Sequence, residues 1–214
     1  MQYSIILALA YRKLGTNPAH FIKELRGGNQ NVVMVKGDAV LTVAEVARHV
    51  GIVDTTQECT YELCHEVKSS ANGQQQQGEQ FVFRRLDHSV IGANAKDDKD
   101  WLLYTPSNYQ KLEAMVQKEK ANFCVTGDVL TKLANHAVKE ATLDKNSFAI
   151  DDRAVLNHPA ARAALSNLVP IISVFARDTP RHKEAVIVGL SRASLKRTLI
   201  FGHKLVKTRL MARP

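Results

Sequence analysis

The chain has 214 residues, of which 45% are hydrophobic, enough to bury the core of one domain and unlike the composition of a disordered protein. Its formal net charge of +8 resides at one end, because residues 191–214 contain seven Lys or Arg and no acid, which leaves +1 for residues 1–190. A nucleic-acid partner is therefore not expected, and the longest apolar run, residues 5–11, is far shorter than the roughly 20 residues that span a bilayer.

Hydrophobic periodicity predicts a strand, a loop and a helix in the first quarter of the chain. Residues 31–35 form an apolar run typical of a buried strand, and residues 36–40 form the loop that follows it. Residues 41–50 then carry apolar side chains at helical spacing, until Gly51 ends the helix.

Residues 55–106 predict a small β-rich insertion. A polar low-complexity stretch, rich in Gln, separates two of its strands and is assigned no chemistry. The three cysteines of the chain indicate reduced thiols, and Cys59, Cys64 and His65 lack the second ligand pair that a zinc site needs. The predicted strands are residues 60–64, 79–84 and 100–105.

Helices and strands alternate again in the rest of the chain. Ser107 is the expected N-cap of a helix over residues 107–120, and residues 121–125 return to a strand. The following Gly127-Asp128 pair is interpreted as a strand-to-helix connection, with a second phosphate-binding loop as the alternative. Two amphipathic helices follow, one around residues 130–137 and one over 158–166. The βαβα order predicts a parallel sheet flanked by helices.

The segment VFARDTPRHKE at residues 174–184 is the most informative one. An apolar strand ends just before it, and Pro180 suits the first turn of a helix over residues 181–190. This topology places Arg177 at the carboxyl end of a strand and Lys183 on the next helix, where open α/β sheets bind ligands. Two cations so placed suit a phosphorylated ligand, and two ordinary solvated cations are the alternative.

Several segments resemble the phosphorylation domain of P-type ATPases. VFARDTPRHKE is similar to the family's "FAR…P…K" element, and MVKGDAVLT at residues 34–42 resembles "MITGDN..TA". FCVTGDVL at residues 123–130 resembles "LCLTGDGL" of the fifth subgroup, and LALAYRKL at residues 7–14 resembles "LALGYKEL". The sequence over residues 168–184 suits the endoplasmic-reticulum branch of that subgroup.

The resemblance covers roughly residues 1–200 and implies an incomplete haloacid-dehalogenase-like (Rossmannoid) fold. Residues 1–30 would be the end of a nucleotide-binding domain with a truncated linker. Residues 31–202 would be the phosphorylation-type α/β domain, with the insertion at about residues 55–106, and residues 203–214 a divergent basic tail. Members of the family couple ATP hydrolysis, through an aspartyl phosphate and with Mg²⁺, to moving cations or membrane segments.

The resemblance also implies a nucleotide site. Arg177 and Lys183 would contact the phosphates or ribose of ATP, while Gly37 and Asp38 would lie at the N-terminus of a helix and steady the nucleotide. Lys36 stands where the family has a threonine whose hydroxyl touches the phosphoryl group.

Two motifs needed for catalysis are missing from the sequence. No DKTGT nucleophile motif occurs, and LDKNS at residues 143–147 only begins like it. TLIFGHK at residues 198–204 stands where the Mg²⁺ carboxylates of GDGTND are expected, with His203 in place of the first one. The chain alone is therefore expected to be soluble and catalytically inactive, a cytosolic fragment of an endoplasmic-reticulum membrane ATPase. A noncatalytic nucleotide-binding or regulatory module and a haloacid-dehalogenase-like phosphatase remain as alternatives.

Overall fold

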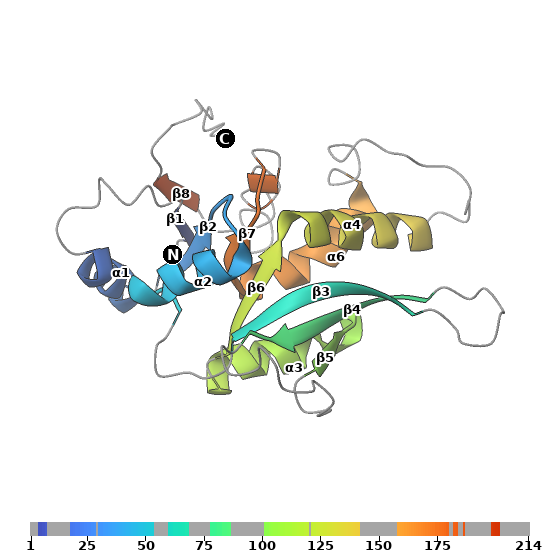
Figure 1. Ribbon diagram of the computed structural model, residues 1–214, viewed down its shortest axis with the longest axis horizontal. Helices are drawn as coiled ribbons and strands as arrows, with labels where there is room; N and C mark the ends of the chain where they lie inside the picture. The colour runs from blue at the N-terminus through green and yellow to red at the C-terminus, as the bar shows by residue number, and fades with distance from the viewer. Residues whose placement is uncertain are drawn as a thin grey trace.

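In the part of the chain that the structure describes, eight strands form one sheet, and helices cover both of its faces (Figure 1). The computed structural model describes residues 4–7, 18–28, 30–53, 60–68, 78–86, 101–119, 121–141, 158–179, 182–183, 186 and 198–201. The strands are β1 (Ser4–Leu7), β2 (Asn31–Val35), β3 (Thr60–Lys68), β4 (Gly78–Arg85), β5 (Trp101–Tyr104), β6 (Asn122–Thr126), β7 (Ile172–Ala176) and β8 (Thr198–Phe201). The main α-helices of this part of the chain are α1 (Pro18–Gly27), α2 (Val40–His49), α3 (Tyr109–Ala114), α4 (Gly127–Ala141) and α6 (Pro159–Leu168).

The strand order is β5-β4-β3-β6-β7-β2-β1-β8. All neighbouring pairs from β3 to β8 along this order are parallel, whereas β4 is antiparallel to both β3 and β5. The predicted α/β class, with parallel strands flanked by helices, is confirmed. Because parallel strands are joined by crossover helices, both faces of such a sheet are buried, as is observed.

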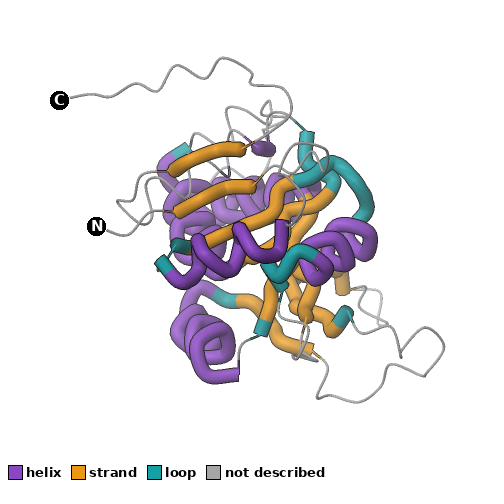
Figure 2. The backbone as a smooth tube through the Cα atoms, turned by 90° about the vertical axis from the view of Figure 1, so that its left-hand side faces the viewer, coloured by secondary structure: helices purple, strands orange, loops and turns teal. Residues whose placement is uncertain are grey.

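Two hydrophobic cores lie on opposite faces of the sheet. In β2, Val33 and Val35 face the first core, shared with α3, α4 and α6, whereas Val32 and Met34 face the second core, shared with α1 and α2. This alternation follows from the two-residue period of a strand. In Figure 2 the helices accordingly lie on either side of the strands.

The β-rich run continues the main sheet. β3 pairs in parallel with β6, beginning at Thr60 beside Asn122, and β4 and β5 extend the sheet beyond it as antiparallel strands. Phe83 of β4 packs on Phe123 of β6, with ring centroids 4.6 Å apart. The three strands predicted over residues 55–106 are therefore present, and they share the first core with the parallel strands.

The helical segment after β5 begins earlier than predicted. Thr105, and not Ser107, is the N-cap: its side chain and that of Asn108 exchange hydrogen bonds with each other's backbone N–H groups as a capping box. Pro106 explains the shift, because proline is preorganised for the first helical position. The segment starts as a 3₁₀ turn, becomes α3 and ends in a π-helical turn over Met115–Glu119.

Most of the other predicted elements agree with the structure to within one or two residues, whereas β3 continues to Lys68 and α4 spans Gly127–Ala141, so both are longer than predicted. The helix after residue 40 ends before Gly51, whose φ is 77°, and the strand before the Arg177 segment is β7. After Pro180, residues 182, 183 and 186 are helical, and the rest of that predicted helix lies outside the described residues. Segments 7–14 (beyond Leu7), 69–77, 143–147 and 203–214, together with Cys59, lie outside them too. Among the helices described, none has the length and apolar character to traverse a lipid bilayer.

Candidate anion-binding site at the carboxyl edge of the sheet

The loops after β2 and β7 lead away from two neighbouring parallel strands toward opposite faces of the sheet. The two strands are neighbours, with Met34 beside Val174. After β2 the chain turns into α2, which packs in the second core, whereas after β7 it reaches Val186, which is buried in the first core. The two connections therefore leave toward opposite faces of the sheet. Open α/β sheets bind ligands at such a point, outside the carboxyl ends of the strands.

Backbone hydrogen bonds hold the two loops together. The Lys36 N–H donates to the carbonyl oxygen of Phe175 at 2.9 Å, and the Arg177 N–H donates to that of Asp38 at 2.9 Å. A third bond, 3.3 Å long, runs from the Asp178 N–H to the Lys36 carbonyl oxygen. We call these three bonds the clasp. It places Asp38 and Arg177, two residues that the sequence assigned to one site, next to each other.

Arg177 has a strained backbone. Its φ is 50°, which makes it the sole non-glycine residue with positive φ in the part of the chain that the structure describes. This left-handed conformation costs an L-residue about 1–2 kcal/mol. The clasp supplies the bonds that hold it, and the side chain is exposed at the switch point. Strain of this kind concentrates at functional sites, so the outlier supports a role for Arg177.

Lys36 forms an ion pair with Asp38, with 2.6 Å between Nζ and Oδ2. Both side chains are partly exposed to solvent, so the pair contributes little to stability. Its chemical effect is local: the ammonium group offsets the carboxylate that would otherwise repel an anion in this loop. Gly37 between them is exposed, and an added Cβ there would meet only an ordinary contact with Asp178.

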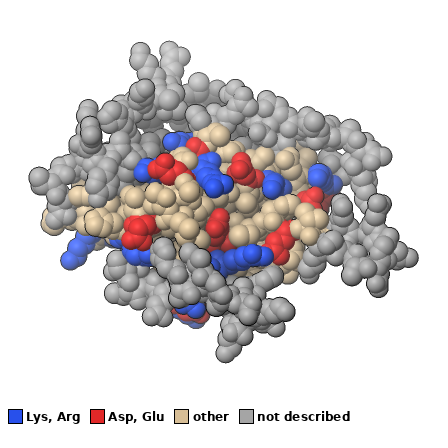
Figure 3. Space-filling view, viewed as in Figure 1, with Lys and Arg blue, Asp and Glu red and all other residues tan. Residues whose placement is uncertain are grey.

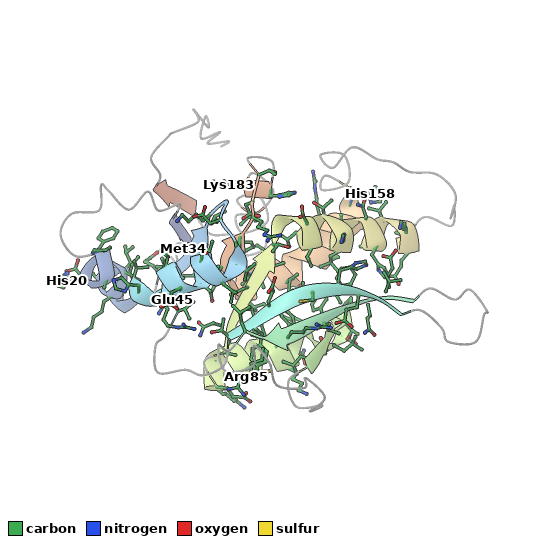
Figure 4. All side chains as sticks on the ribbon, viewed as in Figure 1. His20, Met34, Glu45, Arg85, His158 and Lys183 are labelled. Atoms are coloured by element: carbon green, nitrogen blue, oxygen red, sulfur yellow. The ribbon has the colours of Figure 1, made fainter. Side chains whose placement is uncertain are left out.

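Lys183 reaches the same edge because a capping box starts its helical turn. The Thr179 N–H donates to His182 Nδ1 at 3.3 Å, and the His182 N–H donates to Thr179 Oγ1 at 3.4 Å. The Lys183 N–H then donates to the Thr179 carbonyl oxygen. Thr179 is thus the N-cap and His182 the third helical residue, where a capping box usually has Glu or Gln. Figure 4 shows Lys183 beside the end of β7, on the same edge as the loop after β2.

Asp178, which the sequence did not single out, is buried beneath this turn. Its side chain is 0% exposed, and neither carboxylate oxygen has a hydrogen-bond partner among the described residues. Burial raises the pKa of this carboxyl from its ordinary value of 3.8 to about 7, with Lys183 opposing the rise and Asp128 adding to it. His182 Nδ1 lies 3.9 Å from Oδ1. No local pattern signalled this residue, since its burial depends on elements far apart in the sequence.

His182 also connects the turn to α4. Its Nε2 lies 3.2 Å from Thr131 Oγ1, and its ring covers Gly127, the first residue of α4. A Cβ added at Gly127 would stand 1.8 Å from His182 Nδ1. Gly127 therefore makes room for the imidazole, which gives the Gly127-Asp128 pair a structural role, as the sequence favoured.

The charge of Arg177 also acts on Glu62 in β3. Partial burial raises the pKa of the Glu62 carboxyl above its ordinary value, and the nearby Arg177 guanidinium opposes that rise. Figure 3 shows cations interspersed with anions among the described residues of the visible face. An anion would therefore be attracted by the local cations of this edge.

The described residues do not form a magnesium site. No group of three or more His, Cys, Asp or Glu side chains comes together within them, Asp38 is neutralised by Lys36, and the Asp178 carboxylate is enclosed. No protein-family model and no curated protein sequence matches the chain. The geometry of the edge and the sequence resemblance are therefore the grounds for assigning a function.

Proposed function

We propose that the chain is a phosphorylation-type domain of haloacid-dehalogenase-like fold, related to P-type ATPases of the fifth subgroup, and that it binds ATP at the edge between β2 and β7 without catalysing its hydrolysis. One observation carries the proposal. The Arg177 N–H donates to the Asp38 carbonyl oxygen, so two segments identified by resemblance meet at the switch point of the sheet.

The N-terminus of α2 supports a phosphate ligand. Ala39 is the N-cap and makes no side-chain capping bond. The first N–H groups of a helix have no partner inside it, and together with the helix dipole they favour an anion. This end of α2 follows directly on Gly37 and Asp38, beside the clasp. Arg177 would supply a planar, bidentate donor and Lys183 a mobile point charge.

The absence of catalysis is part of the proposal. Phosphoryl transfer in the resembled family needs an aspartate nucleophile and carboxylates that hold Mg²⁺, and neither motif occurs in the sequence. In this proposal the sequence belongs to the cytosolic machinery of an endoplasmic-reticulum ATPase that moves cations or membrane segments, and the other parts of that machinery supply the chemistry.

The Lys36–Asp38 ion pair favours a second candidate, a regulatory module that binds nucleotide without belonging to a pump. Lys36 replaces a threonine whose hydroxyl would touch the transferred group, and it adds a third cation to the edge. This loop is suited to hold an anion and not to transfer a phosphoryl group.

Calorimetric titration with ATP, with and without Mg²⁺, tests the proposal. Arg177→Ala and Lys183→Ala are each expected to weaken ATP binding about tenfold or more, because a hydrogen bond to a charged group contributes about 1.5–3 kcal/mol. Lys111→Ala is the matched control: this exposed lysine of α3 lies away from the edge and its loss should leave the affinity unchanged. No binding to the wild type at millimolar ATP, or an equal loss in the control, would contradict the proposal.

A further inference from the structure

The ring of His182 has one lone pair and two candidate partners for it. A neutral imidazole accepts a hydrogen bond at one nitrogen and donates at the other. Nδ1 receives the N–H of Thr179 at 3.3 Å, which leaves Nε2 as the donor to Thr131 Oγ1. Asp178 Oδ1 also lies 3.9 Å from Nδ1. Since two acceptor atoms face each other there, Asp178 and His182 gain no hydrogen bond from each other in this arrangement.

One added proton changes the arrangement. When Asp178 Oδ1 carries this proton, the hydroxyl group can donate it to the Nδ1 lone pair. A hydrogen bond then joins Oδ1 to Nδ1, and the lone pair is no longer available to the Thr179 N–H. The backbone half of the capping box survives, because the His182 N–H still donates to Thr179 Oγ1. The ring half is lost.

We propose that a titrating proton on Asp178 competes with the Thr179 amide for the lone pair of His182 Nδ1, which makes His182 a positioning residue for the turn that carries Arg177 and Lys183. Without the proton the ring closes the capping box and fixes the turn. With the proton the ring turns to Asp178 and the turn loosens. The proton competition stands on the geometry alone, whereas its consequence for ATP rests on the function proposed above.

The surroundings place the titration near neutral pH. Asp178 has its pKa raised to about 7, mainly by burial, and the charged groups that act on it are Lys183 from its own turn and Asp128 from α4. From α4 the ring meets Thr131, which is uncharged, and the backbone at Gly127. Gly127 and Thr131 hold the ring against the turn, so that it exchanges partners without leaving the site.

Two substitutions fix the two states. Asp178→Asn keeps the size of the side chain and carries an amide N–H that can donate to Nδ1 at every pH, which mimics protonated Asp178. His182→Gln places at the third helical position a residue that closes a capping box and does not titrate. The first variant is expected to hold the turn open and the second to hold it closed.

NMR of the full chain between pH 5.5 and 8.5 tests the inference. In the wild type the amide shift of Thr179 and the ¹⁵N shift of His182 Nδ1 are expected to change together as Asp178 loses its proton, with one midpoint near pH 7. The Thr179 amide should stay at its low-pH position in Asp178→Asn and at its high-pH position in His182→Gln. A Thr179 shift that does not change with pH in the wild type, or that titrates unchanged in Asp178→Asn, would overturn the inference.

Calorimetry on the wild type and His182→Gln separates this inference from the proposed function. The change in ATP affinity between pH 6.5 and pH 8 includes the titration of ATP itself, which is common to both proteins. It is expected to be at least threefold larger in the wild type. Equal changes in the two proteins would overturn the positioning role. If neither protein binds ATP, the proposed function fails, and the NMR titration still decides whether the proton competition exists.

Discussion

At the scale of single residues, the unusual feature is a buried acid with no hydrogen-bond partner among the described residues. The Asp178 carboxylate has lost its hydration, and no described group replaces the lost hydrogen bonds. Such burial disfavours the charged form, which is the cause of the raised pKa. This destabilising group lies next to Arg177 and under the turn that carries Lys183.

Asp178 is expected to make stability depend on pH. Because its pKa is higher in the folded chain than in the unfolded one, the folded state binds more protons between about pH 4 and pH 7, and stability falls as the pH rises through this window. The destabilisation is fully present above pH 7. Asp178→Asn should therefore be more stable than the wild type at pH 8 and show a flatter profile between pH 4 and 7.

Urea unfolding at several pH values measures this effect. At about 1.4 kcal/mol per pKa unit, the gain at pH 8 has a ceiling of about 4 kcal/mol. The exposed Glu119→Gln, in the π-helical turn after α3, is a control that should leave the profile unchanged. A wild-type profile that is flat between pH 4 and 7 would show that Asp178 does not titrate as stated.

At the scale of elements, the contact between α4 and the turn after β7 decides how the site is held. The imidazole of His182 occupies the space that a side chain at Gly127 would fill. Thr126 caps the same end of α4, where its Oγ1 accepts from the Val129 N–H at 3.4 Å. The start of α4 is therefore fixed both by its own cap and by the turn that packs on it.

Gly127→Ala is expected to destabilise the fold by about 1–3 kcal/mol, the usual cost of overpacking a closed site. Glycine-to-alanine changes in helices otherwise tend to stabilise, by about 0.4–1 kcal/mol. Gly27→Ala in α1 is the matched control, because an added Cβ there meets nothing within 4 Å. Urea unfolding should move the two midpoints in opposite directions. Equal midpoints would show that His182 moves aside without loss.

At the scale of the whole molecule, the antiparallel strands and the parallel strands share one sheet and one core. β3 joins them by pairing with β6 on one side and β4 on the other. The first core contains Phe83 and Leu63 from the antiparallel pair together with Val125 and Phe175 from the parallel strands. A shared core of this kind predicts cooperative unfolding.

The single tryptophan, Trp101 in β5, provides a reporter at the edge of the sheet. Unfolding followed by its fluorescence is expected to coincide with unfolding followed by far-UV circular dichroism, which reports on all helices and strands. Phe83→Ala should lower the free energy of unfolding by about 3–5 kcal/mol. Both unfolding midpoints should therefore move together to lower denaturant concentration. Two separate transitions would show that residues 60–104 unfold as an independent unit.

The sequence by itself determined most of the elements and the candidate cations. Apolar runs and helical periodicity specify β2, β6, β7, α2, α4 and α6, because these signals arise from neighbours in the chain. The order of residues from Phe175 to Lys183 also places Arg177 after a strand and Lys183 in a helical turn. The capping box of Thr179 and His182 had a readable spacing, although histidine at its third position concealed it.

Tertiary structure alone decided which elements meet. Strand order, the switch point between β2 and β7, the burial of Asp178 and the contact of His182 with Gly127 all join segments far apart in the sequence. The early start of the helical segment at Thr105, in contrast, was a local signal, carried by Pro106. The periodicity of the sequence shows which face of a helix or strand is apolar, but not which other element packs against that face. That choice depends on how whole helix and sheet faces fit together in the folded chain.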